Sequence, residues 1–244
     1  MERKRRTLVG MSSLSRTRAQ TPRIADMIYK ELHLRIVSMQ LKPNDQLSEK
    51  ELLLQFGVSR TPLREAILRL ADDGLLTIYP QSGTFVSPIP VRLLQESILI
   101  RKALETVIVE AATLRVSDSD IEALDFNLAE TVQADSSEDL ELFHRLDGEF
   151  HKLIGRVSGL ETVMGMIEHV QGHINRYRLL TLPQEGRLKR VIHEHRLVRD
   201  AMCARDPAAA GQAMAFHIGQ MLMEVEALEA LDREYFHDDR KSAD

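Results

Sequence analysis

The amino-acid sequence predicts a mainly helical protein in two parts, an N-terminal part with one small β-hairpin and a C-terminal bundle built from helices. Three observations support this. Apolar residues recur at three- and four-residue steps through most of the 244 residues, as on one face of an α-helix. Strand-forming residues flank a turn near residue 80. Ser87-Pro88-Ile89-Pro90 is an extended break, because neither proline has an N–H to donate, and we place the domain boundary there.

The N-terminal part begins with a segment that lacks apolar periodicity. Residues 1–20 are basic and rich in Ser and Thr, so we expect a mobile arm. A helical pattern starts at Arg23 and stops at the turn residues Pro43-Asn44-Asp45. We expect residues 21–88 to form one compact domain.

Two short helices with a tight turn between them follow this pattern. Ser48 and Glu51 have the spacing of a capping box, and the helix that they start stops at Gly57. The second helix is capped by either Ser59 or Thr61, and Thr61 would put a proline at the first helical position. Two helices joined by a glycine-containing turn are typical of a helix-turn-helix.

The second helix and the hairpin after it favour binding to DNA. Arg60, Thr61 and Arg64 are on its exposed face near its N-terminus, where free amides attract phosphate and arginines can reach guanine. Two arginines alone would more simply be a solvated helix face. The hairpin of residues 75–79 and 84–86 follows in the right order to be a wing, and this order predicts a winged helix-turn-helix.

Charge is divided unevenly between the two parts. Residues 1–88 carry 14 Lys and Arg against 9 Asp and Glu, whereas the whole chain has a net charge of −5. A basic N-terminal third on an acidic body suggests that a polyanion meets the first part.

The rest of the chain has the pattern of an all-α domain, which we place at residues 91–235, with a tail at 236–244. We expect helices over residues 92–115, 118–133, 137–156, 160–180, 184–205 and 207–233. Ser117 or Asp118 would start the second of these, and prolines stand at the starts of the last two.

Composition favours a cytoplasmic protein. The one cysteine, Cys203, cannot form an internal disulfide, which fits a reducing compartment. No apolar stretch approaches the roughly 20 residues that span a bilayer, and the basic N-terminus lacks the apolar core of a secretory signal. We therefore expect no membrane association.

Histidine spacing raises the question of a metal site. Asp147 and His151 are four residues apart, so they lie one turn apart on one helix face, and His195 and His217 on later helices could converge on them. Other histidines at helical spacing weaken this argument, namely His144, His169 and His173. From spacing alone, ordinary surface or core histidines are the simpler interpretation.

Specific segments of the chain resemble the GntR family of bacterial regulators, and the helical part resembles its FadR-type branch, whose effector domain is called FCD. The resemblance covers about residues 23–233. It rests on the segments LKPNDQLSE (41–49), FGVSRTPLREA (56–66), LADDGLL (70–76) and GTFV (83–86). The family often has Gly where this chain has Asn44, and Asn tolerates the left-handed conformation.

The resemblance implies a homodimer that binds a double-stranded DNA operator with two-fold symmetry. It also implies a transcriptional repressor that an effector releases from DNA. By position, the family's DNA contacts fall on Lys50, Arg60, Thr61, Arg64, Gln81, Ser82 and Gly83.

The resemblance also implies a divalent metal ion bound by one Asp and three His. The family motifs are D-x-x-x-H, E-H and a His near the end of the last helix, and this chain fills them with Asp147, His151, His195 and His217. Zn, Ni, Co, Fe and Mn all suit this donor set, and we favour Zn or Ni.

Arg101 is the expected effector-binding residue. It shares the inward face of its helix with Leu104 and Ile108, and the family commonly uses an arginine at this R-x-x-L-E position to meet the effector's carboxylate. The simpler account is an intrahelical pair with Glu105. Open coordination positions on the metal suit a sugar acid, a hydroxy acid or a dicarboxylate. Residues 176–178 (Arg-Tyr-Arg) are further candidates for the same cavity, and the sequence does not choose among them.

Two other functions compete with effector sensing. A metal-dependent hydrolytic enzyme could use an Asp/His centre to activate water, but an enzyme has no use for a recognition helix and a wing, and no acidic residue is clearly placed as a general base. A purely structural metal is the other alternative. We therefore expect a regulator and not an enzyme.

Overall fold

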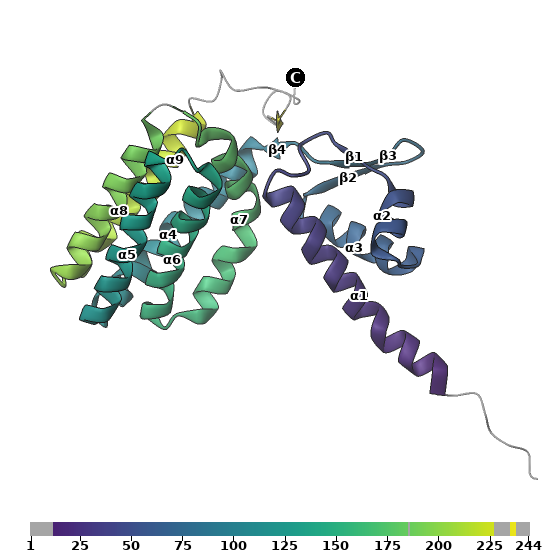
Figure 1. Cartoon of the computed structure of the whole chain (residues 1–244), viewed down its shortest axis with the longest axis horizontal. Helices are drawn as coiled ribbons and strands as arrows, with labels where there is room; N and C mark the ends of the chain where they lie inside the picture. Colours follow the sequence, from purple (N-terminus) through teal and green to yellow (C-terminus); the bar gives the residue numbers. More distant parts are fainter. Residues whose placement is uncertain (1–11, 185, 227–234, 238–244) are drawn as a thin grey trace, which may run out of the picture. The chain divides into compact units, whose positions relative to one another are not determined.

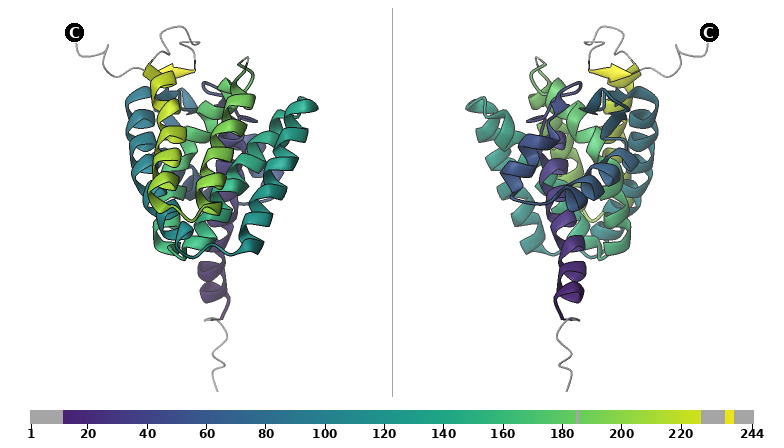
Figure 2. Two further views of the ribbon diagram at one scale, coloured as in Figure 1. Left: turned by 90° about the vertical axis from the view of Figure 1, so that its left-hand side faces the viewer. Right: turned by 90° about the vertical axis from the view of Figure 1, so that its right-hand side faces the viewer.

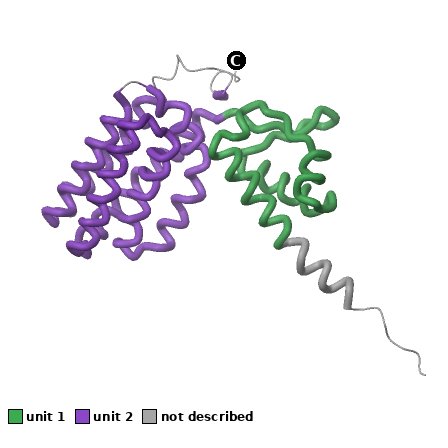
Figure 3. The backbone as a smooth tube through the Cα atoms, in the orientation of Figure 1, with its two compact units in different colours: residues 1–88 green, residues 89–244 purple. Residues whose placement is uncertain are grey.

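The computed structural model describes residues 12–184, 186–226 and 235–237, with side chains for residues 23–184, 186–225 and 235–237. The chain divides into two compact units between Pro88 and Ile89 (Figures 1 and 3). None of the helices in the described part is long and apolar enough to cross a bilayer. The predicted fold class, a helical protein with a small N-terminal sheet and a C-terminal bundle, is confirmed.

The described part of unit 1 contains three helices, α1 (Ser12–Val37), α2 (Glu49–Phe56) and α3 (Arg60–Asp72). The first helix starts at Ser12, inside the segment 1–20 for which we expected a mobile arm; the mobility of that arm stays a prediction. Residues 12–20 lack an apolar stripe, but they have no Gly or Pro and contain good helix formers. Residues 1–11 of the expected arm lie outside the described residues.

The core of unit 1 forms where α1 packs against α3. Ile28, Leu32 and Ile36 of α1 are fully buried, and they cluster with the inward face of α3. That face has the three- and four-residue spacing of an amphipathic helix, and its buried members are Leu63, Ala66, Ile67 and Leu70. This packing holds the exposed face of α3 outward.

A three-stranded antiparallel sheet completes unit 1, with β1 (Gln46–Leu47), β2 (Leu76–Tyr79) and β3 (Gly83–Val86) in the order β1-β3-β2. The predicted hairpin is β2 and β3, with Tyr79 opposite Gly83. Strand β1 was not predicted, because two residues are too few to show alternation.

Unit 2 is a helical bundle (Figure 2). Its helices are α4 (Val91–Thr113), α5 (Asp118–Ser136), α6 (Leu140–Ser158), α7 (Glu161–Thr181), α8 (Arg187–Cys203) and α9 (Pro207–Glu226). Each lies within a few residues of its expected bounds, except that α9 is described only to Glu226 and not to 233. Ser117 rather than Asp118 caps α5, and it does so in a full capping box with Asp120.

One feature of unit 2 differs from the expectation of an all-helical domain. Strands β4 (Ile89–Pro90) and β5 (Phe236–His237) pair in parallel, and Ile89 N–H donates to Tyr235 O at 2.8 Å. The start of the expected tail therefore joins the bundle. The extended break at residues 87–90 supplies the free backbone groups that this pairing needs. The remaining tail residues, 238–244, lie outside the described residues.

Candidate DNA-binding face and metal centre

The turn between α2 and α3 is set by local sequence. Ser48 Oγ accepts a hydrogen bond from Glu51 N–H at 3.3 Å, which is one half of the expected capping box. The reciprocal bond from Ser48 N–H to the Glu51 side chain is absent among the described residues. Gly57 ends α2 in the left-handed conformation with a φ of 62°, and this conformation suits glycine.

Helix α3 starts at Arg60, with Ser59 as its N-cap, so the alternative cap at Thr61 was wrong. Pro62 is the third helical residue, where its missing N–H costs nothing because the first-turn amides have no partner within the helix. The Ser59 side chain makes no cap bond. Free amides therefore remain at this N-terminus, and they favour an anion.

The side chains expected to contact DNA from these helices are all exposed: Lys50, Arg60, Thr61 and Arg64. Arg64 Nε lies 3.7 Å from Glu49 Oε2, a distance that leaves it a loose surface pair and free to turn to another partner. The exposed start of α3 is thus a cationic surface at the positive end of a helix dipole.

The wing turn has the backbone that its residues require. Gln81 and Ser82 are exposed, and Gln81 has a φ of 67°. Gly83 has a φ of 125°, and a Cβ there would lie 2.7 Å from Gln46 Nε2. Gln46 Nε2 donates to Ser82 O at 3.2 Å, so strand β1 anchors the turn. Asn44 takes the left-handed conformation expected for it, with a φ of 70°.

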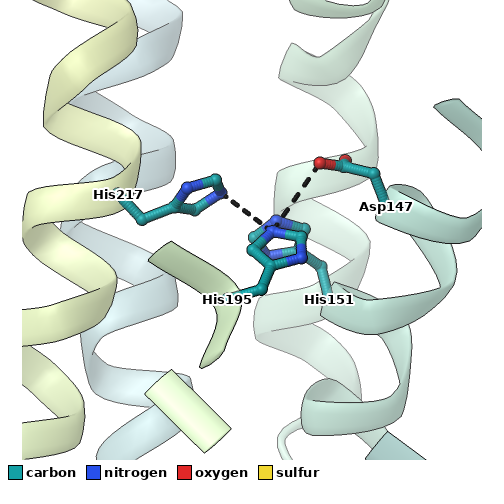
Figure 4. A group of neighbouring side chains, drawn as sticks. All are labelled: Asp147, His151, His195 and His217. Atoms are coloured by element: carbon teal, nitrogen blue, oxygen red, sulfur yellow. Dashed lines mark hydrogen bonds and ion pairs between the residues drawn. The ribbon is translucent and has the colours of Figure 1, made fainter. Parts of the chain in front are cut away.

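In unit 2, Asp147, His151, His195 and His217 come together from α6, α8 and α9 (Figure 4). All four are buried, and each offers one ligand atom such that these atoms lie within 4.8 Å of one another. His195 Nε2 is 3.2 Å from His217 Nε2 and 3.7 Å from Asp147 Oδ1. Three imidazoles and one carboxylate fit a divalent metal ion, and buried side-chain atoms of Asp147, His151 and His195 have no hydrogen-bond partner within the described residues. The cluster is consistent with a metal site of undetermined metal.

Two buried carboxylates orient two of these imidazoles. Glu194 Oε2 accepts from His217 Nδ1 at 2.7 Å, and Glu105 Oε2 contacts His151 Nδ1. Each contact fixes the proton on Nδ1 and leaves Nε2 with a free lone pair, as in the carboxylate–histidine–metal arrangement of metalloproteins. His195 is held differently, because its ring stacks on Phe150 with centroids 4.0 Å apart.

Burial sets the protonation state of the cluster. It lowers the pKa of His151, His195 and His217 below 6.5, so all three are neutral at pH 7 and able to bind a metal. Burial raises the pKa of Glu194 to about 7 although Arg190 opposes this, and a more basic carboxylate accepts a hydrogen bond more strongly. Burial would also raise the pKa of Glu105, but Arg101 and His151 outweigh it and hold this pKa below 4.5.

Arg101 and His151 share one carboxylate. Arg101 Nε donates to Glu105 Oε1 at 2.5 Å, while the other Glu105 oxygen contacts His151. The intrahelical pair that the sequence offered as the simpler account therefore forms. Nevertheless, both terminal nitrogens of the buried Arg101 guanidinium have no hydrogen-bond partner within the described part of the chain. Buried donors of this kind require an acceptor.

Among residues 176–178, Arg178 is the one that reaches the cluster. It forms an ion pair with Asp147 Oδ2, on the carboxylate oxygen opposite the one that faces His195. Tyr177 instead donates to Glu224 at 3.1 Å. A pocket between α7, α8 and α9 opens beside the cluster, and Arg178, Glu194 and His217 line it.

Spacing alone did not identify Glu105, Glu194 and Arg178 as neighbours of the histidine cluster. Glu105 and Glu194 were visible as members of the R-x-x-L-E and E-H motifs, but a sequence does not show which carboxylate accepts from which imidazole. His169, one of the competing histidines, is exposed and bonds Gly165 O of its own helix at 2.7 Å. It is not part of the cluster.

Comparison with known proteins identifies the family. The family model of the FCD domain matches residues 96–220, and that of the bacterial regulatory proteins of the gntR family matches residues 24–86. The chain belongs to the GntR family, with a C-terminal FCD domain. It is a DNA-binding transcriptional regulator and not an enzyme, which excludes the hydrolytic alternative.

Similar GntR-family proteins cover almost the whole chain. The transcriptional repressor RspR of Escherichia coli K12 is 28% identical over 219 residues, 90% of this chain and 96% of RspR. A helix-turn-helix regulator from an unstable DNA locus of Streptomyces ambofaciens is 32% identical over 212 residues, 87% of this chain and 89% of that protein. The structure of E. coli McbR/YncC superposes with a TM-score of 0.70 at 25% identity, over 84% of this chain and 97% of that one.

Proposed function

We propose that this GntR-family regulator is a repressor that a small carboxylate releases from its operator. The observation that carries the proposal is the pair of unbonded donors on buried Arg101, which share a carboxylate with the buried histidine cluster. Desolvating a guanidinium without an acceptor is costly, so a ligand with an anionic group is the natural partner.

On the DNA side, two copies of the chain each present the N-terminus of α3 and the wing to one half of a two-fold operator. Arg60 and Arg64 read base edges, and the free first-turn amides bind a phosphate. The remaining proposed contacts are Lys50, Thr61, Gln81, Ser82 and Gly83. All of these except Gly83 are exposed.

On the effector side, Asp147, His151, His195 and His217 hold a divalent metal ion, with Zn or Ni favoured. The ion supplies positive charge and coordination positions that oxygen ligands can take. Arg101 binds the carboxylate of a sugar acid, a hydroxy acid or a dicarboxylate, and Arg178 adds a second buried cation beside Asp147.

The pocket beside the cluster has a volume of about 20 Å³, room for one water molecule, so an organic acid must displace side chains. Arg187 and Arg190 line it and both bind Glu224 of α9. Rearrangement of these contacts is how effector binding changes the bundle. By linkage, an effector that weakens DNA binding must be bound less tightly by the DNA complex, in equal measure.

The test is a thermal-shift screen of metal-loaded protein against sugar acids, hydroxy acids and dicarboxylates. We expect at least one acid to raise Tm and to release an operator duplex in a gel-shift assay. Arg101→Gln is expected to abolish both effects. Arg92→Gln, an exposed arginine on the same helix, is the matched control and should abolish neither.

A purely structural metal predicts a different result in the same screen. Metal would raise Tm, but no organic acid would add to that shift. No acid would release the operator, either from wild type or from Arg101→Gln. That outcome would reject effector sensing at this site and leave the DNA-binding role intact.

A further inference from the structure

One carboxylate in unit 2 accepts from three donors on two other helices. Glu224 of α9 accepts from Arg187 Nη1 at 2.5 Å and from Tyr177 Oη at 3.1 Å, and its other oxygen binds Arg190. Arg187 is 5% exposed, and Tyr177 is fully buried. Guanidinium groups that converge on one carboxylate are how proteins bind a carboxylate ligand. We call Arg187, Arg190 and Tyr177 the carboxylate subsite.

The start of α8 and the end of α9 place these groups together. Arg187 and Arg190 are three residues apart at the start of α8, so their side chains lie on one side of that helix. The positive end of the helix dipole is there too. Helices α8 and α9 pack side by side (Figure 1), with Glu224 near the described end of α9. Burial raises the pKa of Tyr177 to about 12, so its hydroxyl keeps the proton that it donates.

The carboxylate subsite opens on the same pocket as the histidine cluster. Arg178 and His217 line that pocket together with both arginines of the subsite. Burial lowers the pKa of Arg178, and the charges of Arg101 and Arg187 lower it further, so all three guanidinium groups lie in one region. Arg187 Nε is buried without a hydrogen-bond partner within the described residues, so the subsite has an unused donor.

We propose that Glu224 occupies the place of a second effector carboxylate, so that the effector is a diacid. This rests on the proposed function and narrows the effectors that it allows. One carboxylate of the diacid binds Arg101, and the other takes the place of Glu224 on the carboxylate subsite. The Glu224 side chain is 21% exposed, so the displaced carboxylate can turn toward water without being desolvated.

Charge balance favours a diacid over a monoacid. Four arginines pair with four carboxylates beside the cluster: Arg101 with Glu105, Arg178 with Asp147, Arg187 with Glu224 and Arg190 with Glu194. The charge of these arginines is thus already matched. A divalent ion at the histidines would add two positive charges in a buried region, where unmatched charge is costly. A dianion neutralises both, whereas a monoanion neutralises one.

The first experiment compares diacids with monoacids on metal-loaded wild type. Isothermal titration calorimetry measures malonate, succinate, glutarate and adipate, their 2-hydroxy forms, and the monoacid of equal carbon number for each. The best diacid should bind at least about tenfold more tightly than its monoacid, because only the diacid reaches the second pair of arginines. Equal Kd values for every pair, or no diacid binding to wild type or Glu224→Gln, would overturn the proposal.

The second experiment changes the internal competitor. Glu224→Gln keeps the size of the side chain and removes its charge, so the ratio of monoacid Kd to diacid Kd should rise about tenfold further. Arg187→Gln should bring this ratio close to one. Glu96→Gln removes a carboxylate that pairs with exposed Arg92 on α4, and this matched control should leave the ratio unchanged. If Glu224 has only a structural role, the ratio in Glu224→Gln would stay the same or fall.

The third experiment needs no knowledge of the effector. Glu224→Ala removes the atoms of one acetate ion and leaves the three donors of the subsite unpaired. In metal-free protein, acetate at ten times its Kd should raise the Tm of this variant by about 3 °C relative to chloride at equal ionic strength. Wild type and Glu96→Ala should show no such shift. The same absence in Glu224→Ala would mean that the three donors form no carboxylate site.

The outcomes separate this proposal from the proposed function. If diacids release the operator but bind Glu224→Gln no more tightly relative to monoacids, the carboxylate subsite is wrong and the proposed function stands. If the ratio rises in Glu224→Gln but no acid releases the operator, the subsite stands and the proposed function is wrong.

Discussion

The start of α3 and the histidine cluster are both collections of polar side chains, but they are built in opposite ways. The α3 side chains are exposed, and their partners within the described chain are weak or absent, as the loose 3.7 Å contact between Arg64 and Glu49 illustrates. The cluster is buried, and four of its polar groups are already fixed by Glu105, Glu194, Phe150 and Arg178.

Because of this difference, the two sites contribute differently to the stability of the fold. Exposed arginines contribute little to stability, so they are available to a partner. Buried imidazoles that converge without a ligand cost free energy, and a bound metal returns it. Substitutions on α3 should therefore lower DNA affinity without changing Tm. Substitutions in the cluster should lower Tm.

The largest expected effect is on the cluster. His195→Ala should remove the metal and lower the free energy of unfolding by about 4 kcal/mol, the contribution of a ligand present at roughly a thousand times its Kd. Metal analysis of protein purified without a nickel column should fall from about one divalent ion per chain to none. His193→Ala, an exposed histidine on the same helix, is the control. Unchanged metal content in His195→Ala would contradict the assignment of this ligand.

The exposed site should show the opposite response. Arg60→Ala and Arg64→Ala are each expected to weaken operator binding by about 1–3 kcal/mol, with Tm unchanged, because both arginines are exposed and neither packs in the core of unit 1. Fluorescence anisotropy with an operator duplex at several salt concentrations measures this, and Arg196→Ala on α8 is the control for loss of one exposed arginine. An Arg60/Arg64 double variant that binds like wild type would remove these residues from the DNA interface.

The two regions also differ in how far the sequence predicts them. The helix-turn-helix is formed by residues that are close together in the sequence. The turn at Gly57, the apolar stripe of α3 and the hairpin could therefore be predicted in order along the chain. The cluster depends on the packing of α6, α8 and α9, and spacing alone left His144, His169 and His173 as equal candidates. The family motifs pointed to the four residues that form the cluster. The roles of Glu105, Glu194 and Arg178 depend on side-chain directions that no spacing encodes.

Buried histidines outside the cluster should make the protein acid-sensitive. Burial, assisted by Arg176, lowers the pKa of His173 to about 4. The unfolded chain, with a pKa of 6.5, then binds a proton that the folded chain does not, so stability is full above pH 6.5 and falls as the pH drops toward 4. Between pH 7.5 and pH 5, protonation of His173 in the unfolded chain should lower the free energy of unfolding by about 2 kcal/mol.

His173→Gln should remove this part of the acid sensitivity. Urea unfolding of metal-free protein at pH 7.5 and pH 5 would show a smaller loss of stability in the variant than in wild type. His169→Gln replaces an exposed histidine one turn away on the same helix and should behave as wild type. Equal acid sensitivity in His173→Gln and wild type would mean that His173 is protonated in the folded state.

The smallest expected effect compares one helix cap in each unit. Ser48 accepts only the Glu51 amide, whereas Ser117 accepts the Asp120 amide at 3.3 Å and Asp120 in turn accepts Ser117 N–H at 2.9 Å. Ser48→Ala should cost about 1 kcal/mol. Ser117→Ala should cost somewhat more, because Asp120 also loses the Ser117 hydroxyl that it accepts at 2.6 Å. In calorimetry, Ser48→Ala should lower the melting temperature of unit 1, and Ser117→Ala should lower the melting temperature of unit 2. A single transition whose Tm is lowered equally by both substitutions would mean that the two units unfold together. The two units would then differ in the kind of site that each carries and not in their stability.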